Sequence, residues 1–473
     1  MGEAPGEGVP WEGVRIRFGR AQSRRVGDER GGAPKEGLSR RMLLAGVASA
    51  FGGGLLVKLA RGPADIGGRS ADIREGAPEG ARAAAGESWE AVRAQFELDP
   101  STIHLAGMLI ASHPEPVRLA IERHRRGLDR NPARYVLEND TPLRLRAVRA
   151  AGKYFGTDPA CVALTDSTTM GLSVLYRGLS VREGEEILTT THDHYSTWAA
   201  LDAVAERRGA RIRKITLYED PSTVSASSVV ERLAEAIGPE TRVLALTWVH
   251  SDTGVKLPIR EIGEMVSEVN GQREPGERIL YCVDGVHGFG VEDEEMGDLG
   301  CDFLVAGCHK WLYGPRGTGV VYSARPEGWQ NMTPLIPPFG VKNTPGLYFS
   351  PGGFHAFEHR WALTEAFEFH ASIGKERIRK RIHALAGRLK EGIASLPRAQ
   401  LHTPMSSKLS AGIVSFEFEG VSAQTVVDRL RQEGIVLSLA PYGLRCIRAT
   451  PTIANTPEEI ERVLRALHPF GRV

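Results

Sequence analysis

Apolar residues follow two different spacings from about residue 96 onward. Short apolar runs rich in β-branched residues predict buried strands at residues 162–165, 186–189, 212–217, 243–247 and 279–283. Between them, apolar residues recur every three to four positions, which predicts amphipathic helices at about 170–179, 196–208, 227–237 and 259–270. This alternation predicts an α/β domain with a mainly parallel sheet and helices on both faces.

A second pattern follows in the C-terminal part of the chain. It predicts one long helix from about 358 to 396, then strands at 412–417 and 436–439 and helices at 423–432 and 456–467. Such an order is typical of a small α+β domain. We therefore expect a large domain over residues 96–355 and a smaller C-terminal domain over residues 356–473.

The N-terminal part of the chain is rich in Gly, Arg and Glu and has no apolar periodicity. Arg40 and Arg41 precede an uncharged run, residues 42–57, that is short and glycine-rich for a membrane-spanning helix. This arrangement resembles a twin-arginine signal, and it predicts delivery to the periplasm by the twin-arginine export machinery. Residues 1–64 would form this disordered n-region and signal, and residues 65–95 a linker. The alternatives are an uncleaved membrane anchor or a cytoplasmic protein.

Composition narrows the class of protein. The chain has 473 residues, of which 41% are hydrophobic and 25% charged, so a wholly disordered or fibrous protein is excluded. Its 59 Lys and Arg against 58 Asp and Glu give a formal charge of +1, and thus no reason to expect a nucleic-acid partner. The five scattered cysteines include no CxxC pair, so we predict neither a disulfide scaffold nor a metal site.

Polar residues of distinct chemistry follow two of the predicted strands. Thr168 and Thr169 come where a strand gives way to a helix, and hydroxyls with free backbone N–H groups at such a position bind phosphate. Asp284 directly follows the strand at 279–283, and ligands of parallel sheets collect beyond the carboxyl ends of the strands. The alternatives are an ordinary helix N-cap for the threonines and a turn at Asp284-Gly285.

Two cationic residues have comparable positions. Lys310 follows the apolar run 303–306, and a lysine buried near an active site can lose its proton and attack aldehydes. Arg448 ends a strand, where it suits a two-pronged clamp on a carboxylate, although it could also be a surface charge. Thr456 and Glu459 have the spacing of a capping box for the last helix.

In their order along the chain, these segments resemble the class V aminotransferase family of fold-type-I pyridoxal-phosphate enzymes. The motifs that carry the resemblance are Asp284-Gly-Val-His287, His309-Lys310 ahead of Gly-Pro, Arg448-Ala-Thr and Asn455-Thr456. The resemblance implies pyridoxal 5′-phosphate as the cofactor, a homodimer, and the fold-type-I transferase architecture. That architecture has a mainly parallel, seven-stranded sheet in the large domain and a small C-terminal α+β domain.

The resemblance also implies roles for the chemically active residues. Lys310 would form a Schiff base with the cofactor and act as the acid and base of the reaction. Asp284 would pair with the pyridinium nitrogen and keep the ring an electron sink. His309 would contact the cofactor phosphate, and Arg448 would clamp the α-carboxylate of the substrate.

The same resemblance implies the remaining cofactor contacts. Thr168 and Thr169 match the phosphate cup, and His287 falls where a side chain hydrogen-bonds the phenolic oxygen of the ring. His194 matches the aromatic residue stacked on the ring, and Tyr195 is the alternative if the register shifts by one residue.

Several positions depart from the family pattern. Gly307 stands where relatives often carry a hydroxyl, so we expect that phosphate contact to be missing or replaced. The Gly-Thr that usually crosses the dimer is not evident in residues 354–360, and residues 250–254 match the substrate loop only loosely. The loop that holds the persulfide cysteine of cysteine desulfurases is absent, and Cys446 is expected on a packed strand.

Residues 131–134 and 309–312 most resemble the isopenicillin-N-epimerase-like branch of the family. We therefore expect an exported enzyme that acts at the α-carbon of an amino acid or amine, as an aminotransferase or an epimerase. One alternative is a cysteine desulfurase or C–S lyase, which the missing cysteine loop disfavours. The other is a non-catalytic exported binding protein on the same scaffold, which the presence of Lys310, Asp284 and Arg448 disfavours.

Overall fold

The computed structural model describes residues 88–338, 344–442 and 444–472. The expected export signal and most of the expected linker lie outside the described residues. Within the described part, none of the helices combines the length and the apolar character needed to cross a bilayer.

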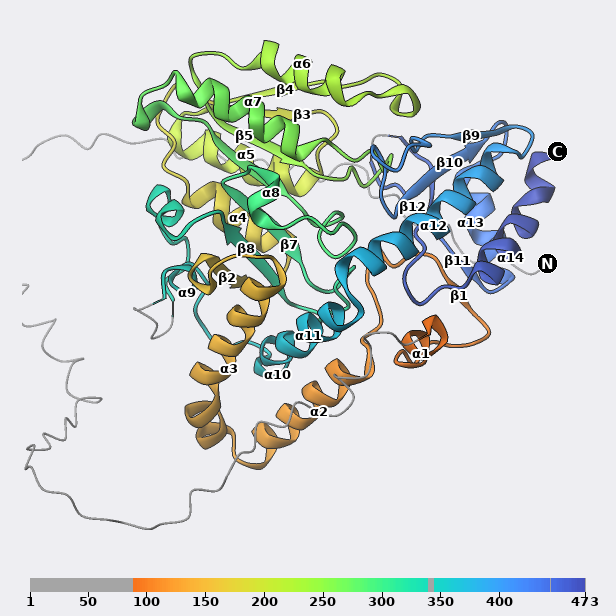
Figure 1. The fold of residues 1–473 in the computed structure, drawn as a ribbon, viewed down its shortest axis with the longest axis horizontal. Helices are drawn as coiled ribbons and strands as arrows, with labels where there is room; N and C mark the ends of the chain where they lie inside the picture. Colours follow the sequence, from red (N-terminus) through yellow and green to blue (C-terminus); the bar gives the residue numbers. More distant parts are fainter. Residues whose placement is uncertain (1–87, 339–343, 443, 473) are drawn as a thin grey trace, which may run out of the picture. The chain divides into compact units, whose positions relative to one another are not determined.

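A seven-stranded sheet forms the centre of the large domain, with the strand order β2-β8-β7-β6-β5-β3-β4 (Figure 1). Its strands are β2 (Val162–Thr165), β3 (Glu186–Thr190), β4 (Arg211–Ile215), β5 (Thr241–Thr247), β6 (Leu280–Asp284), β7 (Phe303–Gly307) and β8 (Gly319–Ser323). Neighbouring strands are parallel except at β8, which runs antiparallel to both β2 and β7. The predicted fold class and mainly parallel sheet are confirmed.

Helices cover both faces of this sheet because alternate residues of each strand point to opposite sides. In β5, Val243 and Ala245 pack into one apolar cluster, and Leu244 and Leu246 pack into another on the opposite face. The first cluster includes α4 (Thr168–Gly178) and α5 (Tyr195–Arg208), and the second includes α3 (Pro132–Tyr154), α6 (Ala226–Ala236) and α7 (Ile259–Gly271). The short α8 (Met296–Leu299) and α9 (Pro345–Tyr348) complete the large domain.

The long helix predicted over 358–396 is wrong, because three helices occupy this span. They are α10 (Phe357–Trp361), α11 (Leu363–Ile373) and α12 (Lys375–Ala394). The break between α11 and α12 lies at Gly374, whose φ of +95° is unfavourable for other residues and does not continue an α-helix. A helical apolar spacing on both sides of the break hides it in the sequence.

The C-terminal domain contains an antiparallel sheet of order β12-β13-β10-β9. Its strands are β9 (Ala399–Leu401), β10 (Val414–Phe418), β12 (Ser438–Leu439) and β13 (Ile447–Ala449), and its helices are α12, α13 (Ala423–Gln432) and α14 (Pro457–Leu467). The capping box predicted at Thr456 and Glu459 begins α14. The strand predicted at 436–439 divides at Leu437, because the chain changes its pairing partner there.

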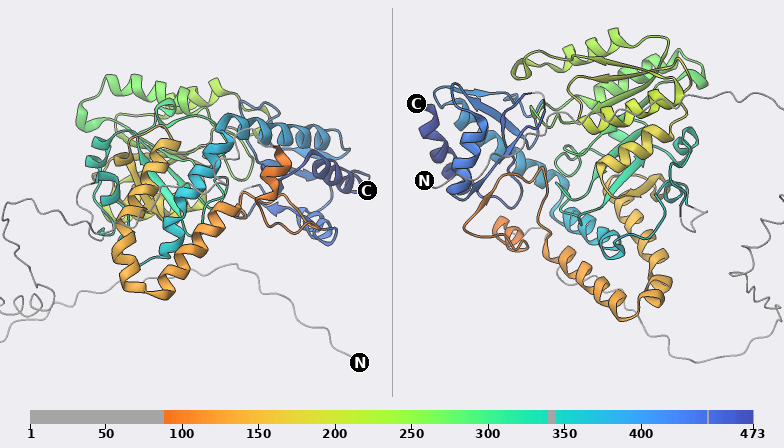
Figure 2. Two further views of the ribbon diagram at one scale, coloured as in Figure 1. Left: turned by 60° about the horizontal axis from the view of Figure 1, so that its bottom comes forward. Right: turned by 180° about the vertical axis from the view of Figure 1, so that it is seen from behind.

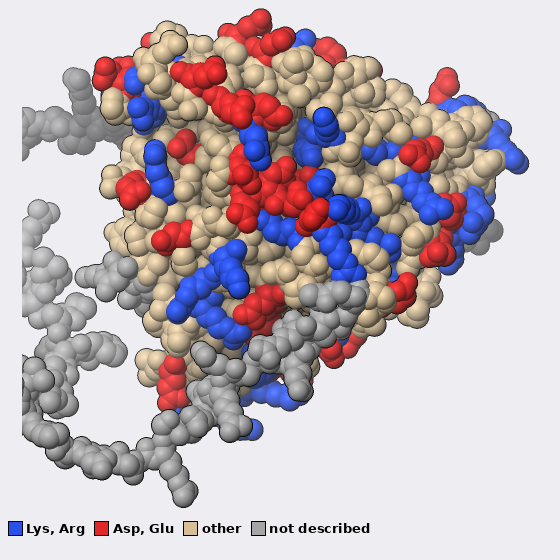
Figure 3. Space-filling model, viewed as in Figure 1, with Lys and Arg blue, Asp and Glu red and all other residues tan. Residues whose placement is uncertain are grey.

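The first described elements are α1 (Trp89–Ala94), β1 (Ile103–His104) and α2 (Glu115–Arg130). Strand β1 pairs in parallel with β11 (Ile435–Val436), so the start of the described chain joins the C-terminal domain. Helices α2 and α3 then form a V that is visible in both views of Figure 2 and packs against α10 and α11. Acidic and basic side chains are interspersed on the face shown in Figure 3, as the near-neutral charge leads one to expect.

Candidate active site

The segments that follow five strands of the large sheet deliver polar side chains to one cavity. Its volume is about 100 Å³, and it lies where β2, β3, β5, β6 and β7 end or meet the residues that follow them. The lining residues are Ser167, Thr168, Thr169, His194, Ser196, Thr247, Ser251, Asp284, Val286, His287, His309 and Lys310. All the predicted cofactor residues are therefore brought together, from positions up to 142 residues apart in the chain (Thr168 to Lys310).

One end of the cavity has unpaired groups that suit a phosphate. Ser167 caps α4 by accepting a hydrogen bond from the backbone N–H of Met170, at 3.1 Å. The buried Oγ1 of Thr168 and Nδ1 of His309 have no hydrogen-bond partner among the described residues. Because buried polar atoms without a partner are rare, and the N-terminus of α4 attracts anions, these groups fit the phosphate of the cofactor.

Gly307 lies beside this cradle. A Cβ atom at this position would lie 2.9 Å from Thr168 Oγ1 and 3.0 Å from the His309 ring. A residue with a hydroxyl would thus displace two of the groups that form the cradle. The hydroxyl of the family pattern is missing at Gly307, where Thr168 and His309 leave little room for a side chain.

Asp284 is a buried carboxylate at the end of β6, with 2% of its surface exposed. Its Oδ1 accepts a hydrogen bond from the backbone N–H of Val286 at 3.2 Å. Burial raises the pKa of Asp284 to about 6, although the Val286 N–H and the nearby Lys310 favour the ionised form. A buried anion with so few partners is a suitable site for a protonated pyridine nitrogen.

Lys310 follows β7 and lines the same cavity. Burial lowers the pKa of its amine to about 8; Asp284 opposes this shift, and Arg448 adds to it. No side-chain hydrogen bond ties its Nζ to another described residue, whereas Nζ of the buried Lys390 donates to Pro404 O, Met405 O and Ser410 Oγ. Of these two lysines, Lys310 has the untethered amine that covalent chemistry requires.

Two histidines line the middle of the cavity, and both are neutral at pH 7. His287 accepts a hydrogen bond from Trp311 Nε1 at its Nδ1, over 3.1 Å, which assigns the ring proton to Nε2. Burial lowers the pKa of His287 well below its usual value, and that of His194 to about 4. In these protonation states, His287 can donate a hydrogen bond from Nε2, and the His194 ring is an uncharged surface on which another ring can stack.

His194 and Tyr195, the two candidates for the residue that stacks on the cofactor ring, differ in their positions. His194 is the N-cap of α5, where its Nδ1 accepts a hydrogen bond from Ser196 N at 3.1 Å, and it lines the cavity. Tyr195 is 56% exposed and is not among the lining residues. The structure therefore favours His194 as the aromatic residue nearest a bound ring.

Arg448, on β13, is 3% exposed and is not among the residues that line the cavity. Its Nη1 donates to Ser251 O at 2.8 Å and its Nη2 to Leu439 O at 2.7 Å, while Nε donates to Ser438 Oγ at 3.3 Å. Each terminal nitrogen keeps a second N–H group. The guanidinium is thus fixed in orientation, beside a residue that lines the cavity.

Six residues that line the cavity or contact its lining were not predicted from the sequence: Ser167, Ser196, Thr247, Ser251, Val286 and Tyr442. Thr247, at the end of β5, has a buried Oγ1 without a partner among the described residues, and the end of the strand is the signal that could have pointed to it. Ser251 hydrogen-bonds the hydroxyl of Tyr442. The Tyr442 ring meets His194 edge-on, with centroids 5.4 Å apart, a contact that no local pattern reveals.

All five cysteines of the chain are buried and free. Cys446, the thiol nearest in sequence to Arg448, is fully buried and donates to Asp252 O at 3.4 Å. Burial raises the pKa of its thiol to about 12. Cys446 is packed as predicted, but it lies one residue before β13 rather than on the strand.

Comparison with known proteins identifies the family. The sequence model of the class-V aminotransferases matches residues 137–466, well over half of the chain. The chain belongs to the class-V aminotransferase family. Membership of this pyridoxal-phosphate-dependent family confirms the predicted cofactor, in agreement with the unpaired phosphate cradle.

Curated relatives of the chain have two kinds of activity. It is similar to isopenicillin N epimerase of Streptomyces clavuligerus, with 28% identity over 80% of this chain and 97% of that protein. It is also similar to a probable cysteine desulfurase of Xylella fastidiosa (strain Temecula1), with 26% identity over 80% of this chain and 94% of that protein. The general family is therefore clear, and the reaction depends on the site.

Solved structures confirm the fold. One is a mutant of C-DES with glycine covalently linked to its PLP cofactor, with a TM-score of 0.72, 24% identity, and coverage of 80% of this chain and 99% of that one. Another is the apo cysteine desulfurase of Thermococcus onnurineus, with a TM-score of 0.71, 22% identity, and coverage of 81% and 98%.

Proposed function

We propose that this pyridoxal-phosphate-dependent enzyme acts at the α-carbon of an amino acid, as an epimerase or an aminotransferase. The observation that carries the proposal is the untethered amine of Lys310 in one cavity with the buried carboxylate of Asp284. The similarity to isopenicillin N epimerase supports the epimerase alternative. A binding protein would gain nothing from an amine with a lowered pKa at this position.

Each end of the cavity would hold a different part of the cofactor. Thr168, Thr169 and His309 would bind its phosphate, Asp284 its ring nitrogen and His287 its phenolic oxygen. His194 would cover the ring. When bound, the cofactor supplies an electron sink for chemistry at the substrate α-carbon.

Lys310 would move the proton in this reaction. Its Nζ, largely deprotonated above pH 8, can accept a proton from the α-carbon and later return one. Delivery of a proton to the opposite face of the α-carbon, by a donor other than Lys310, gives an epimer, whereas return of the proton by Lys310 to another atom leads to amino transfer.

The buried thiols argue against a cysteine desulfurase that forms an enzyme persulfide. Such a reaction needs a thiolate that reaches the substrate sulfur, whereas Cys446 is packed behind Arg448 and bonded to Asp252 O. The segment that leads to β13 instead places Tyr442 against His194 and Ser251. A C–S lyase that uses no thiol is the remaining form of this alternative.

Hydrogen exchange at the α-carbon tests the proposal. The purified enzyme, loaded with pyridoxal 5′-phosphate, should exchange the α-proton of an accepted amino acid for deuterium in D₂O, as measured by mass spectrometry. Loss of chirality without a keto acid identifies an epimerase, and dependence on a keto acid identifies an aminotransferase. Release of sulfide from cysteine or cystine as the main reaction would contradict both.

Substitution of Arg448 by lysine tests the substrate clamp. Lysine cannot supply the planar, two-pronged donor, so the KM for α-amino acids should rise about ten- to a hundredfold. Simple amines, which lack the carboxylate, should retain their KM and serve as the control. Because Arg448 also binds three protein acceptors, the thermal unfolding temperature of the variant must be measured beside its kinetics. An unchanged KM in a folded variant would assign Arg448 a structural role alone.

We also propose that the enzyme is a homodimer. Leu109 and Ile110 are each about half exposed, at 50% and 52%, and both are large and apolar. They adjoin Ala111, whose backbone N–H donates to His309 O at 3.0 Å. A second copy that covers these side chains would therefore lie beside the phosphate cradle. Sedimentation analysis of the purified enzyme measures whether it is a dimer.

Export by the twin-arginine route remains a proposal, since the pair Arg40-Arg41 lies outside the described residues. This route carries folded proteins, which suits an enzyme whose cofactor is made in the cytoplasm. Replacement of both arginines by lysine should leave an active, cofactor-loaded enzyme in the cytoplasm, as measured by cell fractionation. An undiminished exported fraction would contradict the proposal.

A further inference from the structure

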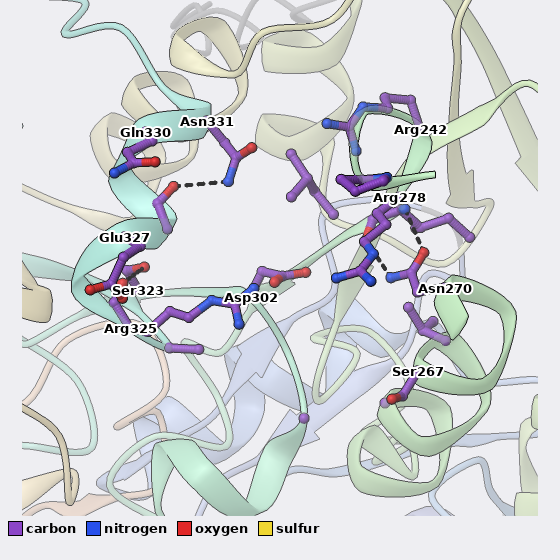
Figure 4. A pocket seen from close by; sticks show the side chains of 18 of the residues that line it. Arg242, Ser267, Asn270, Arg278, Asp302, Ser323, Arg325, Glu327, Gln330 and Asn331 are labelled. Atoms are coloured by element: carbon purple, nitrogen blue, oxygen red, sulfur yellow. Dashed lines mark hydrogen bonds between the residues drawn. The ribbon is translucent and has the colours of Figure 1, made fainter. Parts of the chain in front are cut away.

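A second and larger cavity lies at the edge of the main sheet opposite the active site (Figure 4). Its volume is about 670 Å³, within the range of small-molecule sites. Strands β5, β6 and β7 begin beside it and end at the active site, so a strand of five residues, roughly 15 Å, separates the two. No residue of the cofactor cavity lines it.

Arg242, the second residue of β5, lines this cavity and is 9% exposed. Its Nε and Nη1 have no hydrogen-bond partner among the described residues. The nearby Arg273 differs, because it donates to Thr241 O at 2.6 Å and to Gly238 O at 2.7 Å. The carboxylates of Glu185 and Asp302 lie near enough to act against the lowering of the pKa of Arg242 by burial, but neither accepts a hydrogen bond from its Nε or Nη1. These buried donors are therefore available to an anionic ligand.

Two further arginines line the same cavity from different elements. Arg278 precedes β6 and Arg325 follows β8, and both are exposed with no side-chain hydrogen bond to a described residue. The acids of the cavity are Asp302 and Glu327, and Asp302 Oδ2 already accepts a hydrogen bond from Tyr281 N at 2.9 Å. Three guanidinium groups against two carboxylates leave an excess of positive charge.

We propose that this cavity binds a compact small-molecule polyanion, either an organic phosphate or a polycarboxylate. Planar guanidinium groups bind both chemistries through paired N–H donors, and three of them can enclose one ligand with several anionic groups. The ligand would contact no residue of the cofactor cavity and would not compete with an amino substrate. This inference is independent of the proposed reaction.

Isothermal titration of the enzyme saturated with pyridoxal 5′-phosphate tests the proposal, because its phosphate cradle is then filled. The probes are inorganic pyrophosphate and citrate at low ionic strength. We expect saturable binding of at least one probe, with one site per chain. Preference for pyrophosphate identifies the ligand as a phosphate compound, and preference for citrate as a carboxylate.

Three variants distinguish this site from general attraction of anions to the surface. Arg242→Met, and Arg278→Gln combined with Arg325→Gln, should each weaken binding at least about tenfold. Arg126→Gln, an exposed arginine on α2, is the matched control and should leave binding unchanged. If Arg242→Met fails to fold, the double variant of exposed residues decides alone. Absence of saturable binding to the unmodified enzyme, or equal binding in the double variant, would overturn the proposal.

Discussion

Lys310→Ala should reduce α-proton exchange by at least about a thousandfold. The variant loses the only amine lining the cofactor cavity of the described residues, and positioned acid–base groups contribute about 10²–10⁴-fold to rate. It should also lose the borohydride-sensitive absorption of the lysine-bound cofactor. The phosphate cradle of Thr168 and His309 remains, so the cofactor itself should still bind, as measured by equilibrium dialysis.

The control for this variant is an exposed lysine outside the site. Lys408→Ala should exchange α-protons at the rate of the unmodified enzyme. Addition of a small amine such as ethylamine should restore part of the exchange in Lys310→Ala, because it can occupy the vacated volume and carry a proton. Substantial exchange by Lys310→Ala without added amine would refute the role of this residue.

Asp284→Asn should retain the cofactor but lose about 10²–10³-fold in the rate of α-proton exchange, a loss comparable to removal of one preorganised electrostatic contact. The amide preserves the shape of the side chain and can still accept the hydrogen bond from Val286 N. It cannot supply the negative charge that keeps a pyridine nitrogen protonated. Rates at saturating cofactor separate this effect from weaker binding.

The absorption spectrum gives a second measure of the same change. Loss of charge at Asp284 should alter the visible absorption of the bound cofactor, whereas Asp428→Asn on the exposed face of α13 should not. A variant at Asp284 with full activity and an unaltered spectrum would show that this carboxylate has only a structural role.

The local sequence determined five of the seven strands of the large sheet. Strand β2 has the predicted bounds, and the other four predicted strands differ from the structure by at most two residues at either end. Strands β2, β5 and β6 are buried on both faces, so their apolar runs are short and continuous and give a clear signal. The order of motifs along the chain and the placement of polar residues after strands were also sufficient to name seven residues that the fold brings to one cavity.

The tertiary structure alone decided the shape of the site. Only the fold shows that His194 lines the cavity and Tyr195 does not, because this depends on how the N-terminus of α5 is oriented. Only the fold shows that Thr168 and His309 crowd the position of a Cβ atom at Gly307. The contact of Tyr442 with Ser251 joins residues 191 positions apart. No pattern of neighbouring residues contains such information, because packing between distant segments creates it.

The same limit applies to the arginines of the second cavity and to the helix break at Gly374. In the sequence Arg242 is one charged residue at the start of an apolar strand. Only the structure shows that its buried Nε and Nη1 lack a hydrogen-bond acceptor among the described residues, whereas Arg273 is hydrogen-bonded to Thr241 O. At Gly374 the apolar spacing is helical on both sides, so only the backbone conformation shows the break. The sequence thus determined which elements form and which chemistry is present, because both depend on local residue pattern. The fold decided which polar groups lack partners, because that depends on every segment packed around them.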